Sequence, residues 1–502
     1  MFNVRLGRLA QLTGRQFQRA TLVLCLSAFV VILVATRWGP GLSDDSYSYL
    51  RPVREALAGK PLALSPQFPP LLPIVLLPFG VVGLDPVEGI RLLNAALFST
   101  SAYLLALYIF EITGSRTFSV LGVGFLLVSA PMIQAYSRAL SEPLYIALTL
   151  LAGLCLGRFL REGSRLMLLA AGISGGLSFA TRYVGAATVL ALIATVLVGL
   201  DDRWTRKVGN ALMVATAGLL PMSIYMARNI AEVASPTGHG RFLLTWAFQP
   251  PSNAGLYNFL TWFIPGRFVR GREVEALVAC ALGVIVASVI VGATHKRTFA
   301  DGGKALLSDP LVRFLLFFIG ANLVGLMLAR GFALMGDTFN ERYIAPMYPA
   351  LLVLVASVLA TAWRLGSRTA RMLVGLACAL LGALLGYRGV GAVAHSYQIG
   401  DGYSGRRWHE SETLAYMMRR PGTSFATTAP VGFYFWTGER PAGMPSSEGL
   451  DEFKRNLCDS GSLLVIVNEL PPEFYGIETE DLVRGLTLVR DFSEGSIWAC
   501  YQ

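Results

Sequence analysis

The feature of this sequence that most restricts its fold is a series of long apolar runs. Each run has roughly 16–24 residues, the length that an α-helix needs to cross the hydrocarbon core of a membrane. Only 15% of the residues are charged, whereas a soluble globular chain has about a quarter. The sequence therefore predicts a polytopic α-helical membrane protein.

Eleven membrane-spanning helices are predicted from these runs. Residues 1–36 contain four arginines before an apolar core, but no small-residue cleavage site follows, so we interpret them as an uncleaved first helix rather than a signal peptide. The predicted spans are residues 20–36, 90–112, 117–131, 143–160, 166–181, 184–200, 209–227, 275–294, 311–330, 344–363 and 371–388.

Lysine and arginine are concentrated in alternate loops, which predicts the orientation of the chain. The N-terminus and the basic loops 161–165, 201–207, 295–297 and 363–371 are expected on the cytoplasmic side. The C-terminus then lies outside the plasma (inner) membrane. We attribute the net charge of +10 to this topology and to contacts with membrane lipids, because the sequence contains no nucleic-acid-binding module.

Three long loops fall on the predicted outer side, at 37–89, 228–274 and 389–502. In the first, "SYLRPVREALAG" has the pattern of an interfacial helix, and the proline-rich "FPPLLPIVLLPFGVVG" indicates an interfacial or re-entrant element.

The last loop begins a domain of its own. The sequence divides into a transmembrane domain, 1–396, and a small extracytoplasmic α/β domain, 397–502, with strands expected at 462–468, 486–492 and 496–502. In that domain, "GFYFWTG" is interpreted as a buried helix rather than as a surface that stacks on sugars.

Two of the six cysteines, Cys458 and Cys500, lie in the domain that is expected outside the cell. An oxidising compartment allows them to form a disulfide, and two unpaired structural cysteines are the alternative. Closing this loop would stabilise the fold by roughly 3–4 kcal/mol in the chain-entropy treatment.

The first candidate site is the acidic pair Asp44-Asp45, directly after the first span. A carboxylate can act as a general base toward a hydroxyl group or as a metal ligand. The same residues can instead cap the helix that starts near Ser46, and the spacing alone does not separate these roles.

A second acidic group, Glu142, lies at the predicted outer start of the fourth span. Arg138 is four residues earlier, so the two side chains would share a face, and form an ion pair, if this turn is helical. The functional interpretation is a second carboxylate in the catalytic site.

Several arginines occupy similar outer helix ends. Arg342 enters the tenth span, where it either extends toward the headgroups or binds a phosphate with its forked donors. Arg182 and Arg241 are further candidates for phosphate binding. The four histidines show no metal-ligand spacing. Carboxylates with arginines at the lipid boundary suit a substrate that has a lipid tail and a phosphate.

These segments resemble the GT-C glycosyltransferases, specifically the protein-mannosyltransferase-like and aminoarabinose-transferase-like branch. The resemblance rests on the order of a first helix, the acidic pair, an amphipathic helix, "PPLLPIVLLPFGVVG" and "GIRLLNAAL". The later "SRALSEPLY" and "ERYIAPMYP" are also similar to family segments. The match covers residues 20–230 and, more loosely, 310–350.

The resemblance implies a fold, a reaction and a set of roles. A sugar would move from a polyprenyl-phosphate donor to a hydroxyl of a glycan, lipid or protein acceptor, with inversion, on the outer face. Asp44 takes the position of the catalytic base. Asp45 takes that of a family glutamate, and its shorter side chain leaves its role open. Arg138, Arg342, Arg182 and Arg241 would contact the donor phosphate. Some members need a divalent cation such as Mg²⁺ or Mn²⁺, for which Asp44 and Asp45 are the candidate ligands.

Two other function classes stay open. One is a transporter or flippase of lipid-linked sugars, and the other is a non-catalytic scaffold that displays residues 397–502. Transporters tend to have repeated halves with ionisable groups at mid-membrane. Here the charges lie at helix ends and the sequence contains no internal repeat, which favours the enzyme.

Overall fold

The computed structural model describes residues 12–200, 202–239, 260, 303–331 and 341–500. The chain divides into two compact units. The first contains Met1–Arg37 and Tyr49–Tyr397, and the second contains Trp38–Ser48 and Gln398–Gln502. The short segment Trp38–Ser48 was expected in the first outer loop of the transmembrane domain, but it belongs to the second unit.

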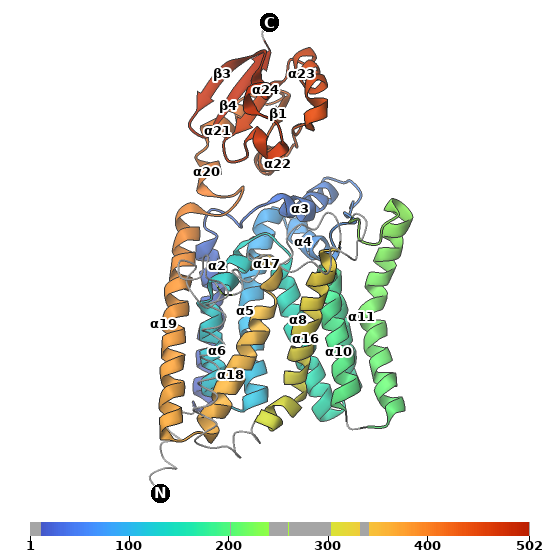
Figure 1. Cartoon of the computed structure of the whole chain (residues 1–502), viewed down its shortest axis with the longest axis vertical. Helices are drawn as coiled ribbons and strands as arrows, with labels where there is room; N and C mark the ends of the chain where they lie inside the picture. The colour runs from blue at the N-terminus through green and yellow to red at the C-terminus, as the bar shows by residue number, and fades with distance from the viewer. Residues whose placement is uncertain (1–11, 201, 240–259, 261–302, 332–340, 501–502) are drawn as a thin grey trace. The chain divides into compact units, whose positions relative to one another are not determined.

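The first unit is a bundle of long helices with roughly parallel axes (Figure 1). Its elements are α2 (Gly14–Ala35), α3 (Asp44–Leu57, which starts in the second unit), α4 (Leu71–Val81), α5 (Pro86–Thr113), α6 (Arg116–Leu127), α7 (Ala130–Ser137), α8 (Glu142–Glu162), α9 (Arg165–Thr181), η1 (Tyr183–Gly185), α10 (Ala186–Gly199), α11 (Trp204–Val233), α16 (Pro310–Ala329), α17 (Glu341–Ile344), α18 (Met347–Leu365) and α19 (Arg368–Ile399).

Seven of the helices in the described residues are long and apolar enough to cross a membrane, namely α2, α5, α8, α11, α16, α18 and α19. Helices α6 and α7 pass the same test as a pair that is bent by 60°. Helix α9 and the pair η1–α10 are shorter apolar helices. Together these elements coincide with ten of the eleven predicted spans, and the remaining span, 275–294, lies outside the described residues.

Local sequence signals fix where these helices begin and end. Helix α5 begins at Pro86, and the Asp85 carboxylate accepts a hydrogen bond from the amide of Val87 at 2.8 Å. Gly114 ends the helix in a left-handed conformation, φ 64°. Helix α4 has only 11 residues and contains Pro78, so it is too short to span a membrane, as the prolines of this segment indicated.

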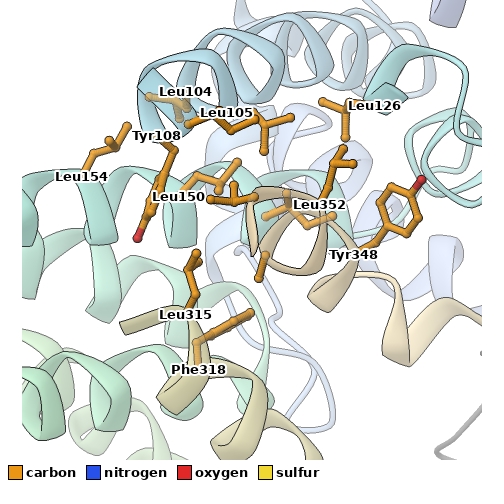
Figure 2. Packing of buried hydrophobic residues seen from close by; sticks show 14 of the residues in the cluster. Leu104, Leu105, Tyr108, Leu126, Leu150, Leu154, Leu315, Phe318, Tyr348 and Leu352 are labelled. Carbon is orange, nitrogen blue, oxygen red and sulfur yellow. The ribbon is translucent and has the colours of Figure 1, made fainter. Parts of the chain in front are cut away.

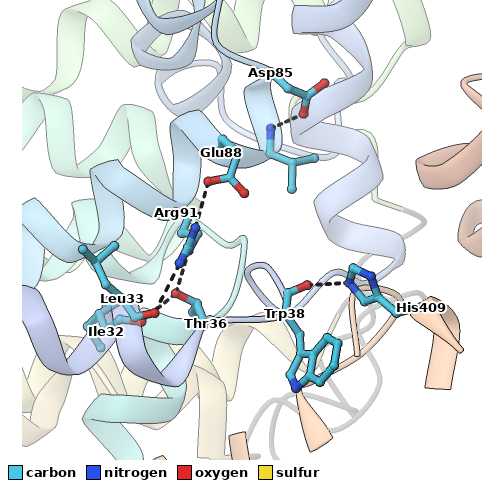
Figure 3. A network of polar contacts seen from close by, with 9 residues as sticks. Ile32, Leu33, Thr36, Trp38, Asp85, Glu88, Arg91 and His409 are labelled. Carbon is cyan, nitrogen blue, oxygen red and sulfur yellow. Dashed lines mark hydrogen bonds and ion pairs between the residues drawn. The ribbon is translucent and has the colours of Figure 1, made fainter. Parts of the chain in front are cut away.

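Polar contacts tie the end of α2 to the start of α5 (Figure 3). The Arg91 guanidinium donates to the Glu88 carboxylate at 3.0 Å, to the Thr36 hydroxyl at 3.1 Å and to the Leu33 carbonyl at 3.3 Å. The last two contacts satisfy oxygens at the C-terminal end of α2, where intrahelical donors run out. They fix the end of α2 from which the acidic segment continues.

The core of the first unit lies between α5, α6, α8, α16 and α18 (Figure 2). Large side chains from these helices meet there, including Tyr108, Leu150, Phe318 and Leu352. Glycines allow close helix approach: a Cβ at Gly153 of α8 would lie 2.4 Å from the Tyr108 hydroxyl and 2.6 Å from the Phe314 ring. In a bilayer such close packing, rather than the hydrophobic effect, holds helices together.

The second unit is a small α/β domain with a four-stranded sheet in the order β1-β2-β4-β3. Strands β1 and β2 are parallel, and the other two pairs are antiparallel. Its elements are α20 (Arg406–His409), α21 (Glu412–Met418), β1 (Phe425–Thr427), α22 (Pro430–Thr437), η3 (Ser447–Gly449), α23 (Leu450–Asp459), β2 (Leu463–Val467), η4 (Pro472–Tyr475), α24 (Thr479–Val483), β3 (Leu486–Phe492) and β4 (Gly495–Cys500).

Three of these strands agree with those expected from the sequence, and β1 was missed because it has only three residues. Strand β2 is covered on both faces: Val465 packs with Trp408 and Phe433, while Leu464 and Ile466 face a second apolar cluster. A disulfide joins Cys458 and Cys500, whose Cα atoms are 5.3 Å apart, and this is the pair that the sequence suggested. The segment "GFYFWTG" lies in helix α22 and its continuation, as expected, with Phe433 buried.

Candidate functional site

A buried carboxylate, Glu142, is the centre of the polar cluster in the first unit. It lies in the first turn of α8, where the helix dipole favours a negative charge. Its side chain is only 1% exposed. Ionised carboxylates are stable in such surroundings only when they are paired and hydrogen-bonded, so the partners of Glu142 define the site.

Two arginines from distant parts of the chain pair with this carboxylate. Arg182, at the end of α9, places Nη1 2.7 Å from Glu142 Oε1. Arg342, in the short helix α17, places Nε 2.5 Å from the same oxygen. The cluster therefore carries one negative and two positive charges. A net positive charge in a poorly solvated position is a strong attractor for a phosphate group.

Neighbouring side chains hold the arginines in place. Arg182 Nη1 also donates to the Ser141 hydroxyl at 3.1 Å, and the Tyr49 hydroxyl lies 3.0 Å from the same Ser141 oxygen. The Tyr343 ring centre lies 5.4 Å from the guanidinium carbons of both Arg182 and Arg342. These contacts combine cation–π attraction with hydrogen bonding, and the sequence analysis did not assign roles to Ser141 or Tyr343.

The second carboxylate oxygen of Glu142, Oε2, is buried and has no hydrogen-bond partner among the described residues. A buried acceptor of this kind costs about 1–3 kcal/mol if it stays unsatisfied. The site therefore has a polar atom that a bound donor, such as a substrate hydroxyl or a water molecule, would satisfy.

Arg138 reaches this region in a different way from that predicted. Helix α7 ends at Ser137, and Arg138 has an extended backbone, φ −98° and ψ 147°, so it does not share a helix with Glu142. The predicted i,i+4 ion pair is therefore wrong, and Glu142 pairs with Arg182 and Arg342 instead. The Arg138 side chain does line a small pocket together with Glu142, Glu341 and Arg342. Its carbonyl accepts a hydrogen bond from Asn94 Nδ2 at 2.7 Å.

The fourth predicted arginine, Arg241, lies outside the described residues.

The acidic pair belongs to the second unit. Asp44 and Asp45 are the first two residues of α3, where the helix dipole stabilises their negative charges. The exposed Asp44 accepts a hydrogen bond from the Tyr403 hydroxyl at 3.0 Å. Burial, and then the nearby Asp44 carboxylate, raise the pKa of the Tyr403 phenol. Tyr403 therefore stays protonated and remains a hydrogen-bond donor to Asp44.

The surroundings of this pair are aromatic. Tyr47 packs edge-on against Tyr434, with ring centres 4.8 Å apart, and the Arg440 guanidinium lies 4.9 Å from the Tyr47 ring centre. The preceding chain is held by main-chain contacts, because the amide of Tyr403 donates to the Leu42 carbonyl at 3.0 Å. Tyr403 was not predicted as a site residue, since it is 359 residues from Asp44 in the sequence.

The described residues contain no group of three or more His, Cys, Asp or Glu side chains that could hold a metal ion. Asp44 and Asp45 alone can supply two carboxylates. Mg²⁺ commonly binds through one or two carboxylates and takes its other ligands from water and substrate phosphates. The acidic pair therefore fits a metal that arrives with a phosphorylated substrate.

Comparisons with known proteins agree with this architecture. Residues 55–234 match the family described as dolichyl-phosphate-mannose-protein mannosyltransferase. No curated protein matches the sequence.

Among solved structures, ArnT from Cupriavidus metallidurans bound to undecaprenyl phosphate is similar over 95% of this chain and 97% of its own, with a TM-score of 0.57 and 12% identity. The Archaeoglobus fulgidus oligosaccharyltransferase in its apo form is similar over 89% of this chain and 69% of its own, with a TM-score of 0.51 and 12% identity. Arabinofuranosyltransferase AftD from Mycobacteria is similar over 98% of this chain and 42% of its own, with a TM-score of 0.50 and 14% identity.

These similarities show the fold of the protein. It is a multi-pass membrane protein with the GT-C glycosyltransferase fold. The segment that matches the mannosyltransferase family runs from the last residues of α3 to α11, and ArnT is similar over nearly the full length of both chains.

The buried cluster generates the first prediction. Replacing Glu142 with glutamine leaves two guanidinium groups without their counter-ion, and we expect the folded state to lose about 3–5 kcal/mol. Thermal unfolding of the purified protein in detergent measures this loss as a lower midpoint. The matched control is Glu55→Gln, which breaks a partly exposed ion pair with Arg51 and should change the midpoint little. Equal midpoints for the two variants would contradict the structural role of Glu142.

Proposed function

We propose that this protein transfers a sugar from a polyprenyl-phosphate donor to a hydroxyl group of a glycan, lipid or protein acceptor. The observation that carries the proposal is the buried cluster of Glu142, Arg182 and Arg342 in a bundle with the GT-C fold. The net positive charge of the cluster suits the phosphate of the donor, and the apolar helices around it suit the lipid tail. ArnT, a structural relative, is known with undecaprenyl phosphate bound.

In this proposal the reaction is a single displacement. The Asp44 carboxylate removes the proton of the acceptor hydroxyl, and the acceptor oxygen forms a bond to the anomeric carbon. The bond between that carbon and the phosphate oxygen breaks, and the phosphate leaves with the electron pair. Attack from the face opposite the phosphate inverts the anomeric configuration. The arginines offset the charge that develops on the departing phosphate.

Two features support Asp44 as the base. Its side chain is exposed, so an acceptor can approach it, and the Tyr403 hydroxyl holds one of its oxygens. A divalent cation, where the reaction uses one, would bind at Asp44 and Asp45 and would orient the donor phosphate. Asp45 takes the position of the family glutamate and is proposed as the second ligand.

Replacing Asp44 with asparagine should lower kcat by about 10²–10⁴-fold, because the base that activates the acceptor is lost. Transfer of radiolabelled sugar from a polyprenyl-phosphate donor measures the rate, with Mg²⁺, with Mn²⁺ and with EDTA. Glu55→Gln, a carboxylate change on the same helix, should keep the wild-type rate. A wild-type rate for Asp44→Asn would exclude the assignment of the base, and full activity in EDTA would exclude a required metal.

The donor phosphate is proposed to bind Arg342 and Arg182, with Arg138 at the same pocket. Arg342→Gln should raise the KM for the donor by roughly 10–100-fold, the value of a lost charge-assisted contact, while the KM for the acceptor stays unchanged. Steady-state kinetics with each substrate varied in turn measure both constants. Arg51→Gln, which removes a partly exposed arginine of α3, is the matched control. An unchanged donor KM for Arg342→Gln would remove this residue from the phosphate site.

We propose that the second unit lies on the extracytoplasmic side of the plasma membrane and that the N-terminus is cytoplasmic. The disulfide between Cys458 and Cys500 supports this side, because such bonds persist in oxidising compartments.

In protein from the native membrane, peptides that contain Cys458 and Cys500 should remain crosslinked until a reductant is added. The double serine variant should lose roughly 3–4 kcal/mol of stability, the value expected for a loop of this length. Mass spectrometry after alkylation without reductant measures the bond, and limited proteolysis measures the loss. Free, fully alkylated thiols at both positions would argue for a reducing compartment.

A further inference from the structure

A large groove lies at the opposite end of the first unit from Glu142. It has a volume of about 810 Å³ and lies where α5 ends, α6 begins, α18 ends and α19 begins. We call it the arginine groove, after the two basic residues in its wall. Its lining includes Phe118, Leu121, Trp363, Arg364, Arg371 and Val374.

Helix α5 separates this groove from the candidate site. Asn94, near the start of α5, hydrogen-bonds the Arg138 carbonyl beside the Glu142 cluster. Thr113, the last residue of α5, accepts a hydrogen bond from Arg364 in the groove. At 1.5 Å per residue, these two positions are roughly 30 Å apart along the helix, about the thickness of a hydrocarbon core. The groove is therefore not part of the site proposed for sugar transfer.

The two arginines of the groove differ from those of the Glu142 cluster in their partners. Arg364 donates to the Thr113 carbonyl, and Arg371 Nε donates to the Trp363 carbonyl at 3.1 Å. Neither is paired with a carboxylate among the residues that the structure describes. The main-chain contacts orient both guanidinium groups but leave their charges uncompensated beside an apolar surface. An anion is the natural counterpart of two such groups.

The rest of the groove lining is largely apolar, and part of it comes from α19. Only 17% of the apolar window of α19 is buried within the protein, compared with 72% for α8. Phe118, Leu121 and Val374 form the wall next to the arginines, while the hydroxyl-bearing Ser115 and Thr117 lie at the same end as the charges. Two guanidinium groups beside an apolar surface match the polarity of an anionic lipid.

We propose that the arginine groove binds an anionic phospholipid. The lipid phosphate contacts Arg364 and Arg371, and the acyl chains lie along the apolar faces of α6, α18 and α19. The apolar side chains that line the groove beside the two guanidinium groups suit the acyl chains of such a lipid. The lipid fills the space beside α19 and so holds this helix against the bundle.

The test uses the full-length protein, delipidated in detergent and titrated with phosphatidylglycerol or phosphatidylcholine in native mass spectrometry. We expect phosphatidylglycerol to bind more tightly than phosphatidylcholine. The double variant Arg364→Gln/Arg371→Gln should bind phosphatidylglycerol about 25-fold more weakly, because each basic residue contributes about fivefold to the affinity. Its affinity for phosphatidylcholine should not change.

Two further variants keep the result interpretable. Arg206→Gln removes an exposed arginine of α11 that pairs with Asp202, and it should leave lipid binding unchanged. Ala379→Trp fills the groove without changing its charge, and it should weaken binding of both lipids. Equal phosphatidylglycerol binding by the wild type and the double variant would overturn the proposal. Displacement of the lipid by equimolar inorganic phosphate would also overturn the proposal, because it would indicate a site for phosphate alone. Displacement by a polyprenyl phosphate that binds more tightly than phosphatidylglycerol would overturn it as well.

Discussion

The burial of one carboxylate, Glu142, determines how the polar end of the first unit is built. A charge with 1% exposure is stable only beside opposite charges, so α9 and α17 must deliver Arg182 and Arg342 to the start of α8. The interruption of the helix at Arg138 allows this arrangement of charges, because α8 then begins at Glu142 rather than continuing from α7. The position of three helix ends therefore follows from one ion cluster.

The membrane-spanning architecture was predictable because its signal is local. A run of apolar residues long enough to cross a bilayer identifies a helix without any knowledge of its neighbours, and the ten described spans coincide with helices for this reason. The partners of Glu142 carry no such signal. Arg342 lies 200 residues away, and the nearer Arg138 was the wrong partner because spacing of four residues implies contact only within a continuous helix.

The acidic pair illustrates the same limit on a larger scale. The sequence assigned residues 37–89 to one outer loop, but Trp38–Ser48 packs within the second unit. Ser404 donates to the Pro40 carbonyl at 2.5 Å, His409 contacts the Trp38 carbonyl at 2.9 Å (Figure 3), and Tyr403 hydrogen-bonds Asp44. These contacts join segments more than 350 residues apart, which no local pattern reveals. Residues 398–502 therefore supply the surroundings of Asp44.

The ratio of one carboxylate to two arginines explains how the first unit can keep a positive charge inside a helical bundle. With no carboxylate, two guanidinium groups would repel each other in a medium where charges are poorly screened. Glu142 therefore stabilises both arginines through one oxygen, Oε1. In the proposed function, a donor phosphate would accept hydrogen bonds from guanidinium groups that are already oriented. Ser141 and Tyr343 contact Arg182, and Tyr49 contacts Ser141, so this arginine would not need to reorganise.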